Sequence, residues 1–331
     1  MSLFLPSLKQ FGHLDALHLT LCSVGSRKTS SNHDFGSQAW NLFAPNLTIY
    51  GFDADADACE AANADLAARQ VNWTERHFPS AIADQIGEAT LYVTHDPQCS
   101  SLYPPNAPYL QRFANIKDLV ELEFTFELET TTLDAALTDI GHPTADFLQI
   151  DVQGANLKVL QGAKDLLAHS VLAIQIEVEF SPLYLNEPLF ADIDIFLRSQ
   201  GFMLLDLLPA RIPRDFLQST ERPGQLLWAD AIYVRDPVHT ADTFYRHPDQ
   251  ILKLASIADV LGYIDYALEL LEFLTLHHGT ESTYNLADAI AHTLGEIPAL
   301  VEAGLETLPP IQRLQPFLTQ PLANFSSASP A

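Results

Sequence analysis

The sequence predicts a doubly wound α/β sheet of about seven strands, followed by a helical C-terminal extension. Three observations support this fold class. Residues 146–184 contain a strand pattern, a helix pattern and a second strand pattern, which is the order of a right-handed parallel crossover. Residues 47–52 form an apolar run that ends on an aspartate and precedes an Ala-rich helical stretch. From about His239 onward the periodicity is helical, without a strand pattern.

The composition excludes several classes of protein. Acidic residues number 42 against 17 basic ones, a net charge of −25, and a chain without a basic cluster repels nucleic acid. No apolar run reaches the roughly 18 residues that span a bilayer, and the start lacks the features of a signal peptide. Cys22, Cys59 and Cys99 are too scattered for a disulfide framework or a zinc site. We therefore expect a cytoplasmic protein that binds neither nucleic acid nor membrane.

The first half of the chain alternates between helix and strand. Residues 1–16 have the spacing of a leading helix, and a short helix is expected at residues 38–43. The polar residues 26–36 form a loop. Runs of aliphatic, aromatic and β-branched residues predict strands at residues 18–23, 47–52, 71–78 and 89–94.

The second half continues the sheet. Residues 120–131 alternate between apolar and polar, which predicts a half-buried strand that is antiparallel or lies at a sheet edge. One helix is expected over residues 157–167 and an amphipathic helix over residues 189–200, where Gly201 ends it. The remaining strands are predicted at residues 147–150, 172–178, 202–208 and 227–234, the last two as a hairpin-like return.

We divide the chain into a sheet domain, residues 1–238, and a helical extension, residues 239–331, with a poorly ordered tail. One segment of the extension, GYIDYALELLEF, resembles a helix of a tetratricopeptide-type pair, but a single copy does not establish a repeat. The extension is expected to serve packing or association. A homodimer, or a protein partner bound through residues 239–331, is the corresponding expectation.

The turn and the carboxylate after the first two strands indicate nucleotide binding. The turn at Gly25 brings backbone N–H groups toward a ligand, although one glycine is not a G-x-G-x-x-G fingerprint. Asp53 ends the second strand, where an acidic residue accepts hydrogen bonds from ribose hydroxyls. The alternative for Asp53 or Asp55 is the N-cap of the following helix, and the spacing alone does not decide between them.

Further polar residues follow the next two strands of the crossover. Asp151 and Gln153 come after the strand at residues 147–150, and Glu177 lies near the end of the strand at residues 172–178. Ligands of open parallel sheets bind beyond the carboxyl ends of the strands, so these side chains fall where chemistry is expected.

Several segments share features with one known family. They are DFLQIDVQGANLKVLQGA at residues 146–163, GFDADADAC at 51–59, ATLYVTHDPQCSSLYPPN at 89–106, TTLDAAL at 131–137 and ADAIYVRDP at 229–237. Together they resemble the FkbM-type S-adenosylmethionine-dependent methyltransferases, over residues from about 18 to 237. The resemblance implies a Rossmann-like class I methyltransferase fold and S-adenosylmethionine as cofactor.

The resemblance also implies roles for single residues. Carried over by position, the cofactor would contact Gly25 and Ser26 with its methionine part, Asp53 with its ribose, Ser80 and Ala81 with its adenine, and Asp151 near the transferred methyl. One turn departs from the family. Its usual Asp-Val-Gly-Ala, followed by a second glycine, is here Ser23-Val24-Gly25-Ser26-Arg27, and the polar loop after it is longer. This departure affects the affinity for the cofactor rather than the fold.

The expected reaction is O-methylation of a hydroxyl on a sugar or another secondary metabolite. Methyl transfer to oxygen needs an aligned acceptor and a base for the hydroxyl proton. Asp151 and Glu177 are the candidate bases because they end adjacent strands, whereas His33 and His95 are weaker candidates in loops.

Two alternatives concern the neighbourhood of these bases. Two neighbouring carboxylates can hold a divalent cation, but no third oxygen ligand is assignable, so no metal is predicted. A further alternative for Glu177 and Glu179 is that one of them caps a helix or pairs with an arginine. Ser100, Ser101 and Tyr103 either shape the acceptor pocket or satisfy their own turn.

The competing function is that of a catalytically impaired protein that binds a partner through its helical extension. The altered first turn and the extra helices motivate it. A nicotinamide-dependent oxidoreductase fits poorly because the glycine fingerprint is missing.

Overall fold

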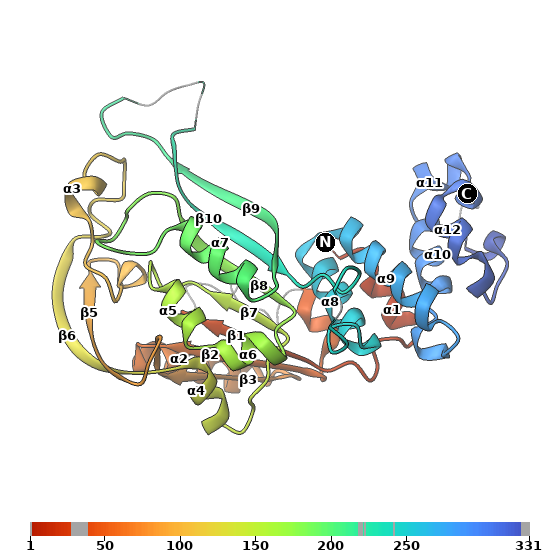
Figure 1. Ribbon diagram of the computed structural model, residues 1–331, viewed down its shortest axis with the longest axis horizontal. Coiled ribbons are helices and arrows are strands. Elements are labelled where there is room, and N and C mark those ends of the chain that lie inside the picture. Colours follow the sequence, from red (N-terminus) through yellow and green to blue (C-terminus); the bar gives the residue numbers. More distant parts are fainter. Residues whose placement is uncertain (1, 28–38, 218–220, 222, 241, 326–331) are drawn as a thin grey trace. The chain divides into compact units, whose positions relative to one another are not determined.

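The computed structural model describes residues 2–27, 39–217, 221, 223–240 and 242–325. The chain divides into two units (Figure 1). One unit consists of the described parts of residues 20–29 and 48–235, and the other of those of residues 1–19, 30–47 and 236–331. The division predicted at residue 238 stays a prediction, and the structure groups the N-terminal residues with the C-terminal helices.

A seven-stranded sheet is the centre of the first unit, with the strand order β3-β2-β1-β7-β8-β10-β9. The pairs β2–β3, β1–β7 and β7–β8 are parallel, whereas β10 runs antiparallel to both β8 and β9. This order confirms the doubly wound sheet and its hairpin-like return. The strands are β1 (Leu19–Val24), β2 (Leu47–Asp53), β3 (Thr74–Pro79), β7 (Phe147–Ile150), β8 (Ala173–Glu179), β9 (Met203–Ile212) and β10 (Gln225–Val234).

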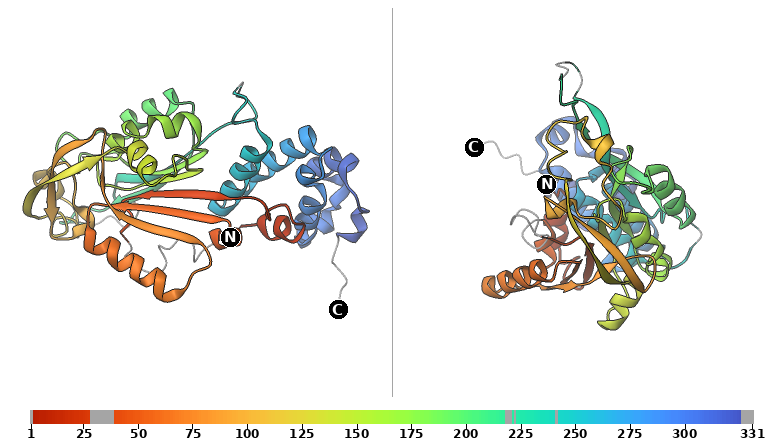
Figure 2. Two further views of the ribbon diagram at one scale, coloured as in Figure 1. Left: turned by 90° about the horizontal axis from the view of Figure 1, so that it is seen from below. Right: turned by 90° about the vertical axis from the view of Figure 1, so that its left-hand side faces the viewer.

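Helices cover both faces of this sheet. The left view of Figure 2 shows α2 below the strands and α5 to α7 above them. Side chains of α4 to α7 bury one continuous apolar core with the strands, and Ile174, Ile176 and Val178 of β8 belong to it. The helices are α2 (Ala56–Arg69), α3 (Ala107–Leu110), α4 (Leu133–Asp139), α5 (Asn156–Gln161), α6 (Lys164–His169) and α7 (Phe190–Ser199).

The helix predicted over residues 157–167 is two short helices, α5 and α6, and this part of the prediction is wrong. The break falls at Gly162, where a Cβ atom would stand 2.1 Å from the carbonyl oxygen of Ala83. Only glycine allows this close approach to the backbone of Ala83.

A second sheet of three strands, in the order β4-β6-β5, is inserted between β3 and α4. Its strands are β4 (Ala81–Ile82), β5 (Gly87–Thr94) and β6 (Leu122–Thr131). The predicted antiparallel pairing of β6 is confirmed, since it pairs in that sense with β5. The predicted half-burial is wrong, because residues 122–127 of β6 are all exposed. Alternation in a sequence separates two faces of a strand, but burial depends on what packs against them.

The second unit is helical, and its N-terminal helix is capped from far along the chain. The helix α1 (Leu5–Gln10) has no side-chain cap of its own. The buried Asp259 carboxylate instead accepts hydrogen bonds from the backbone N–H groups of Leu3, Phe4 and Leu5, at 2.9–3.0 Å. A carboxylate there satisfies N–H groups that lack intrahelical partners and complements the helix dipole.

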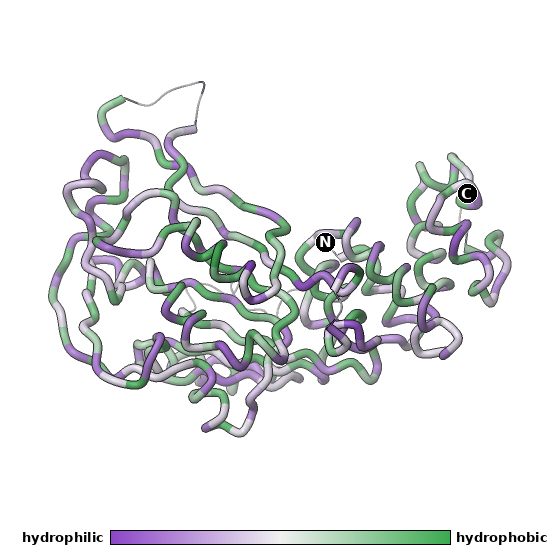
Figure 3. Tube along the Cα trace, in the orientation of Figure 1, coloured by the Kyte–Doolittle hydropathy of each residue, from purple (hydrophilic) through white to green (hydrophobic). Residues whose placement is uncertain are grey.

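The remaining helices of this unit are amphipathic, as the alternating colours along them in Figure 3 show. They are α8 (Pro248–Leu261), α9 (Ile264–His278), α10 (Ala287–Gly295), α11 (Pro298–Ala303) and α12 (Pro309–Leu314), with short 3₁₀ turns at Ala39–Phe43, Ser282–Tyr284, Leu305–Thr307, Gln315–Phe317 and Leu322–Asn324. The predicted helical extension is confirmed. Within the described residues, none of the helices has the length and apolar character that a bilayer span requires.

Candidate active site

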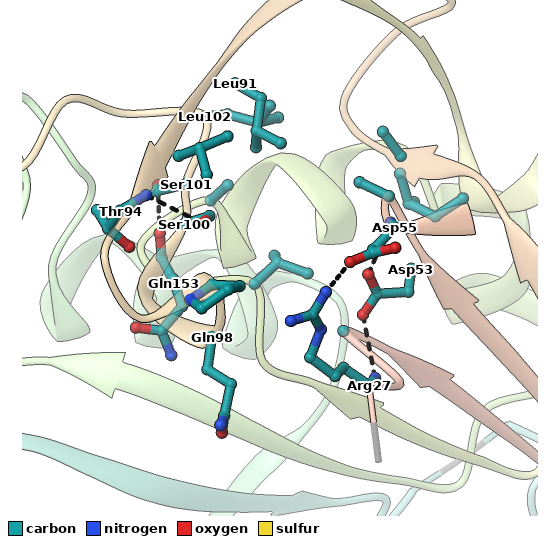
Figure 4. Close-up of a pocket in the computed structure, with 18 of the residues that line it drawn as sticks. Arg27, Asp53, Asp55, Leu91, Thr94, Gln98, Ser100, Ser101, Leu102 and Gln153 are labelled. Atoms are coloured by element: carbon teal, nitrogen blue, oxygen red, sulfur yellow. Dashed lines mark hydrogen bonds and ion pairs between the residues drawn. The ribbon is translucent and has the colours of Figure 1, made fainter. Parts of the chain in front are cut away.

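A cavity of about 600 Å³ lies beyond the carboxyl ends of β1, β2 and β7 (Figure 4). Its walls come from the turns after these strands, the segment after β3, the three-stranded sheet and residues 97–102. Strand order reverses between β1 and β7, and that switch point is where open α/β sheets bind ligands. The volume falls within the roughly 300–1,000 Å³ of small-molecule sites.

Gly25 forms the floor of the cavity at this switch point. Its φ is +83°, and a Cβ atom there would stand 1.8 Å from the carbonyl oxygen of Asp151. The N–H of Asp151 in turn donates to the carbonyl of Val24, at 2.9 Å. Only glycine therefore allows the turn after β1 to pass the turn after β7 at this separation.

Ser26 is not among the residues that line the cavity, although it follows Gly25 directly. Its Oγ is buried and hydrogen-bonded to Nδ1 of His77, at 2.9 Å, and Nε2 of His77 contacts Glu75, at 3.1 Å. The side chain thus anchors the turn to β3. The role of Ser26 as a cofactor-binding residue stays a prediction, and its side chain points to His77 rather than into the cavity.

Asp53 lies in the cavity wall, and its carboxylate organises the backbone around it. Oδ2 accepts from the N–H of Arg27, at 3.0 Å, and Oδ1 from the N–H of Asp55, at 2.9 Å. Burial raises the pKa of Asp53, and the neighbouring Arg27 opposes that effect. Each oxygen retains a lone pair for a further donor.

The N-cap of α2 is Asp55, not Asp53. The Asp55 Oδ1 atom accepts from the N–H of Ala58, at 3.0 Å. This contact excludes Asp53 as the N-cap, while the binding of ribose by Asp53 stays a prediction.

Arg27 projects into the cavity and forms an ion pair with Asp55 (Figure 4). Arg27 belongs to the turn that departs from the family pattern, and it brings a cation to the cavity wall. The remainder of the predicted polar loop, with its weaker candidate base His33, lies outside the described residues.

Ser80 and Ala81 line the cavity on the side of β3, and their contact with adenine stays a prediction. The N–H of Ser80 donates to the carbonyl of Asp53, at 2.9 Å, which holds this segment against the end of β2. Ile82 adds an apolar surface beside them.

Gln153 joins the two predicted bases. Its Nε2 donates to Asp151, at 2.8 Å, and to Glu177, at 3.1 Å, while its Oε1 accepts from the hydroxyl of Tyr184, at 3.0 Å. Gln153 adopts φ +51°, a conformation that is uncommon for residues other than glycine and that clusters at functional sites. Asp151 and Gln153 line the cavity, whereas Glu177 lies behind them and does not.

The pKa values of both carboxyl groups lie above their ordinary range. Burial raises the pKa of Asp151, and the hydrogen bond from Gln153 opposes this. Burial also raises the pKa of Glu177 well above its usual value, and the Asp151 charge adds to the effect. Asp151 is accessible through the cavity although protein surrounds its other sides. Two interacting carboxyls with raised pKa values hold protons at a higher pH than either would in water.

Glu179 and Glu187 extend this acidic cluster into the interior. Oε1 of Glu179 accepts from the N–H of Gly154, at 3.1 Å, and so binds the turn before α5. The other oxygen of each carboxyl group, Oε2 of Glu179 and Oε2 of Glu187, is buried without a hydrogen-bond partner. Among the residues that the structure describes, no group of three or more potential ligands is arranged to hold a metal ion.

The segment at residues 97–102 forms the remaining wall. Ser100 and Ser101 line the cavity, and each also bonds backbone, since Ser101 Oγ donates to the Gln153 carbonyl and Ser100 Oγ accepts from Thr94. Tyr103 and His95 are not cavity-lining, and the exposed His95 ring contacts Glu123, at 3.1 Å.

Several cavity residues were not predicted as site residues from the sequence. In the sequence, Arg27 stood out only as part of a turn that departs from the family pattern. Gln153 stood out only because it follows the strand at residues 147–150. Phe124 and Phe126 of β6 also line the cavity. Their alternating pattern indicated a strand but not a ligand-facing surface.

Comparison with known proteins gives a family for part of the chain. The family described as "Methyltransferase FkbM domain" matches residues 44–204. None of the curated protein sequences matches this chain.

Solved structures that resemble the chain include three methyltransferases. The FkbM methyltransferase from Methylobacillus flagellatus has 11% identity and a TM-score of 0.37; the match covers 66% of this chain and 43% of that one, so this chain spans less than half of its length. A SAM-dependent methyltransferase from Aquifex aeolicus has 9% identity and a TM-score of 0.31, covering 69% and 88%. TrmK from M. capricolum, in complex with S-adenosylhomocysteine, has 9% identity and a TM-score of 0.33, covering 94% and 95%.

Proposed function

Because residues 44–204 of this chain are an FkbM-type domain of the S-adenosylmethionine-dependent methyltransferases, we propose that the protein methylates a hydroxyl group on a sugar or another secondary metabolite. One observation supports this proposal above the others. Asp53 at the end of β2 and Asp151 at the end of β7 line the same cavity at the switch point of the sheet. One site therefore offers a polar partner both to a nucleoside and to a reacting hydroxyl group.

The cavity residues fit S-adenosylmethionine. The Asp53 oxygens each retain acceptor capacity for the ribose hydroxyls, while Ala81 and Ile82 offer a flat apolar edge for adenine. Gly25 leaves the floor of the cavity free of a side chain beside Asp151. When bound, the cofactor supplies an electrophilic methyl group on a sulfonium. These residues bind and orient it.

Asp151 is the proposed general base. It lines the cavity, and its raised pKa brings the carboxylate closer to the acidity that suits proton transfer near neutral pH. Glu177 acts through Gln153, whose amide donates hydrogen bonds to both carboxyl groups. The Asp151 oxygen that accepts this hydrogen bond therefore carries no proton.

A small acceptor is favoured over a nucleic acid. The net charge is −25, and cavity-lining Asp53, Asp55, Asp57 and Asp151 add negative potential where a phosphate backbone would approach. For residues 239–331 we keep the proposal of association, either with a second copy of the chain or with a protein partner.

Titration calorimetry with S-adenosylmethionine and S-adenosylhomocysteine tests the function. Wild-type protein should bind both, and Asp53→Ala should lose at least about tenfold in affinity, because a hydrogen bond to a charged acceptor contributes about 1.5–3 kcal/mol. Asp65→Ala, an exposed site on α2 paired with Arg69, is the matched control and should bind as wild type does. Folded protein that binds neither compound at millimolar concentration would refute the proposal and favour a non-catalytic interaction protein.

A further inference from the structure

We propose that the acceptor of this site is an uncharged alcohol or phenol with a large apolar body, which rests on the β5–β6 face of the cavity. This inference deepens the proposed function and rests on it. We name the surface formed by Leu91, Val93, Phe124 and Phe126 the apolar wall.

The apolar wall is a continuous surface on one face of the three-stranded sheet. The register pairs Leu91 with Phe126 and Val93 with Phe124, so the four side chains emerge on the same side. The rings of Phe124 and Phe126 stack with their centroids 6.3 Å apart. All four residues line the cavity, so the wall belongs to the site rather than to the outer surface.

The phenylalanines of the wall are exposed to an unusual degree. Phe124 is 54% exposed and Phe126 is 44% exposed. Large aromatic side chains that are exposed next to one another cost free energy in water, and such patches mark binding surfaces. A ligand with an apolar body would remove this surface from water and gain affinity from its burial.

The wall lies away from Asp53, the residue assigned to the ribose of the cofactor. In Figure 4, Leu91 and Leu102 stand on one side of the cavity, and Arg27, Asp53 and Asp55 stand on the other. In the same view Ser101 and Gln153 lie on the side of Leu102, where Ser101 Oγ donates to the Gln153 carbonyl. An acceptor on the wall would therefore place a hydroxyl near the Asp151–Gln153 turn.

Charge determines the rest of the acceptor chemistry. Arg27 is the one basic side chain among the described cavity residues, and it is paired with Asp55. The other carboxylates of the cavity, which Arg27 does not pair with, repel a negatively charged acceptor. A positively charged acceptor is not required either, because these carboxylates already accept hydrogen bonds. Two backbone N–H groups donate to Asp53, and the Gln153 amide donates to Asp151. A neutral molecule fits best.

A fluorescence assay with the neutral probe N-phenyl-1-naphthylamine tests this inference on the full chain, saturated with S-adenosylhomocysteine. The double variant Phe124→Ser, Phe126→Ser should bind the probe at least tenfold more weakly than wild type. Phe216→Ser is the matched control, because Phe216 is fully exposed but outside the cavity, and it should leave probe binding unchanged. Neutral 2-naphthol should displace the probe, and anionic 2-naphthalenesulfonate should not.

Three outcomes would overturn the inference. If the probe binds cofactor-free protein and is displaced when S-adenosylhomocysteine is added, the wall holds the cofactor. Equal probe binding by wild type and the double variant, with S-adenosylhomocysteine bound normally, would show that no apolar acceptor rests on the wall. The proposed methyltransferase function would then stand unaffected. Equal displacement by the sulfonate would contradict the requirement for a neutral acceptor. Failure of S-adenosylhomocysteine to bind any form of the protein would instead refute the proposed function, and with it the acceptor role of the wall.

Discussion

Glu187 should make the stability of this protein fall as the pH rises toward neutrality. Its Oε1 accepts from the N–H of Tyr184, at 3.0 Å, while its buried Oε2 has no partner. Burial raises the pKa of Glu187 from its ordinary 4.5 to about 7. We predict that Glu187→Gln removes this destabilisation, because a neutral amide keeps the acceptor atom and adds N–H donors near the carboxyl group of Glu179.

The magnitude follows from linkage between protonation and folding. Between pH 4.5 and 7 the native state binds more protons at Glu187 than the unfolded state does, so the free energy of unfolding decreases as pH rises. A raised pKa of this size corresponds to about 3 kcal/mol, at 1.36 kcal/mol for each pH unit. At pH 5 the variant should therefore be more stable than the wild type by less than about 1 kcal/mol. At pH 8 the variant should be more stable by up to about 3 kcal/mol.

Urea unfolding between pH 5 and 8.5, followed by circular dichroism, measures this difference. Glu60→Gln, at an exposed position of α2, is the control and should parallel the wild type at every pH. A Glu187→Gln stability that stays parallel to the wild-type curve, or that falls below it at pH 8, would refute the reasoning.

Four further changes test the site. Asp151→Asn should lower the rate of methyl transfer at least about 100-fold, with S-adenosylhomocysteine affinity within threefold of wild type; a normal rate would remove Asp151 as the base. Gln153→Ala should move the acidic limb of the pH–rate profile upward, because the Gln153 hydrogen bond lowers the pKa of Asp151, and an unmoved limb would contradict this. His77→Ala and Ser26→Ala should each weaken S-adenosylhomocysteine binding severalfold and lower stability by about 1–2 kcal/mol in urea titrations, because both loosen the turn after β1. Full cofactor affinity in either variant would show that this anchor does not position the turn.

Much of the main sheet could be predicted from the sequence because its signals are local. The apolar runs of β2 and β7 each end on an aspartate, and parallel strands buried on both faces leave such runs in the sequence. Asp53 and Asp151 could therefore be placed at one sheet edge before their surroundings were known. The helical character of residues 239–331 was equally readable from its period.

Other features were not predictable, because they depend on residues that are distant in the sequence. Ser26 faces His77 of β3, 51 residues further along the chain, so the motif indicates its position but not its direction. Asp259, which caps α1, lies even further from its partner residues in the sequence. Gln153 joins Asp151 to Glu177 only because β7 and β8 are neighbours in the sheet.

The sequence by itself determined the alternation of strand and helix, the carboxylates at the strand ends and the resemblance to one methyltransferase family. Only the tertiary structure decided which side chains share the cavity and which face of β6 lines it. The physical reason is that hydrophobic period reports whether a residue lies on one face or the other of its own element. The surroundings of that face are set by packing between elements, and in β6 the same alternation that predicted burial leaves Phe124 and Phe126 open to the cavity.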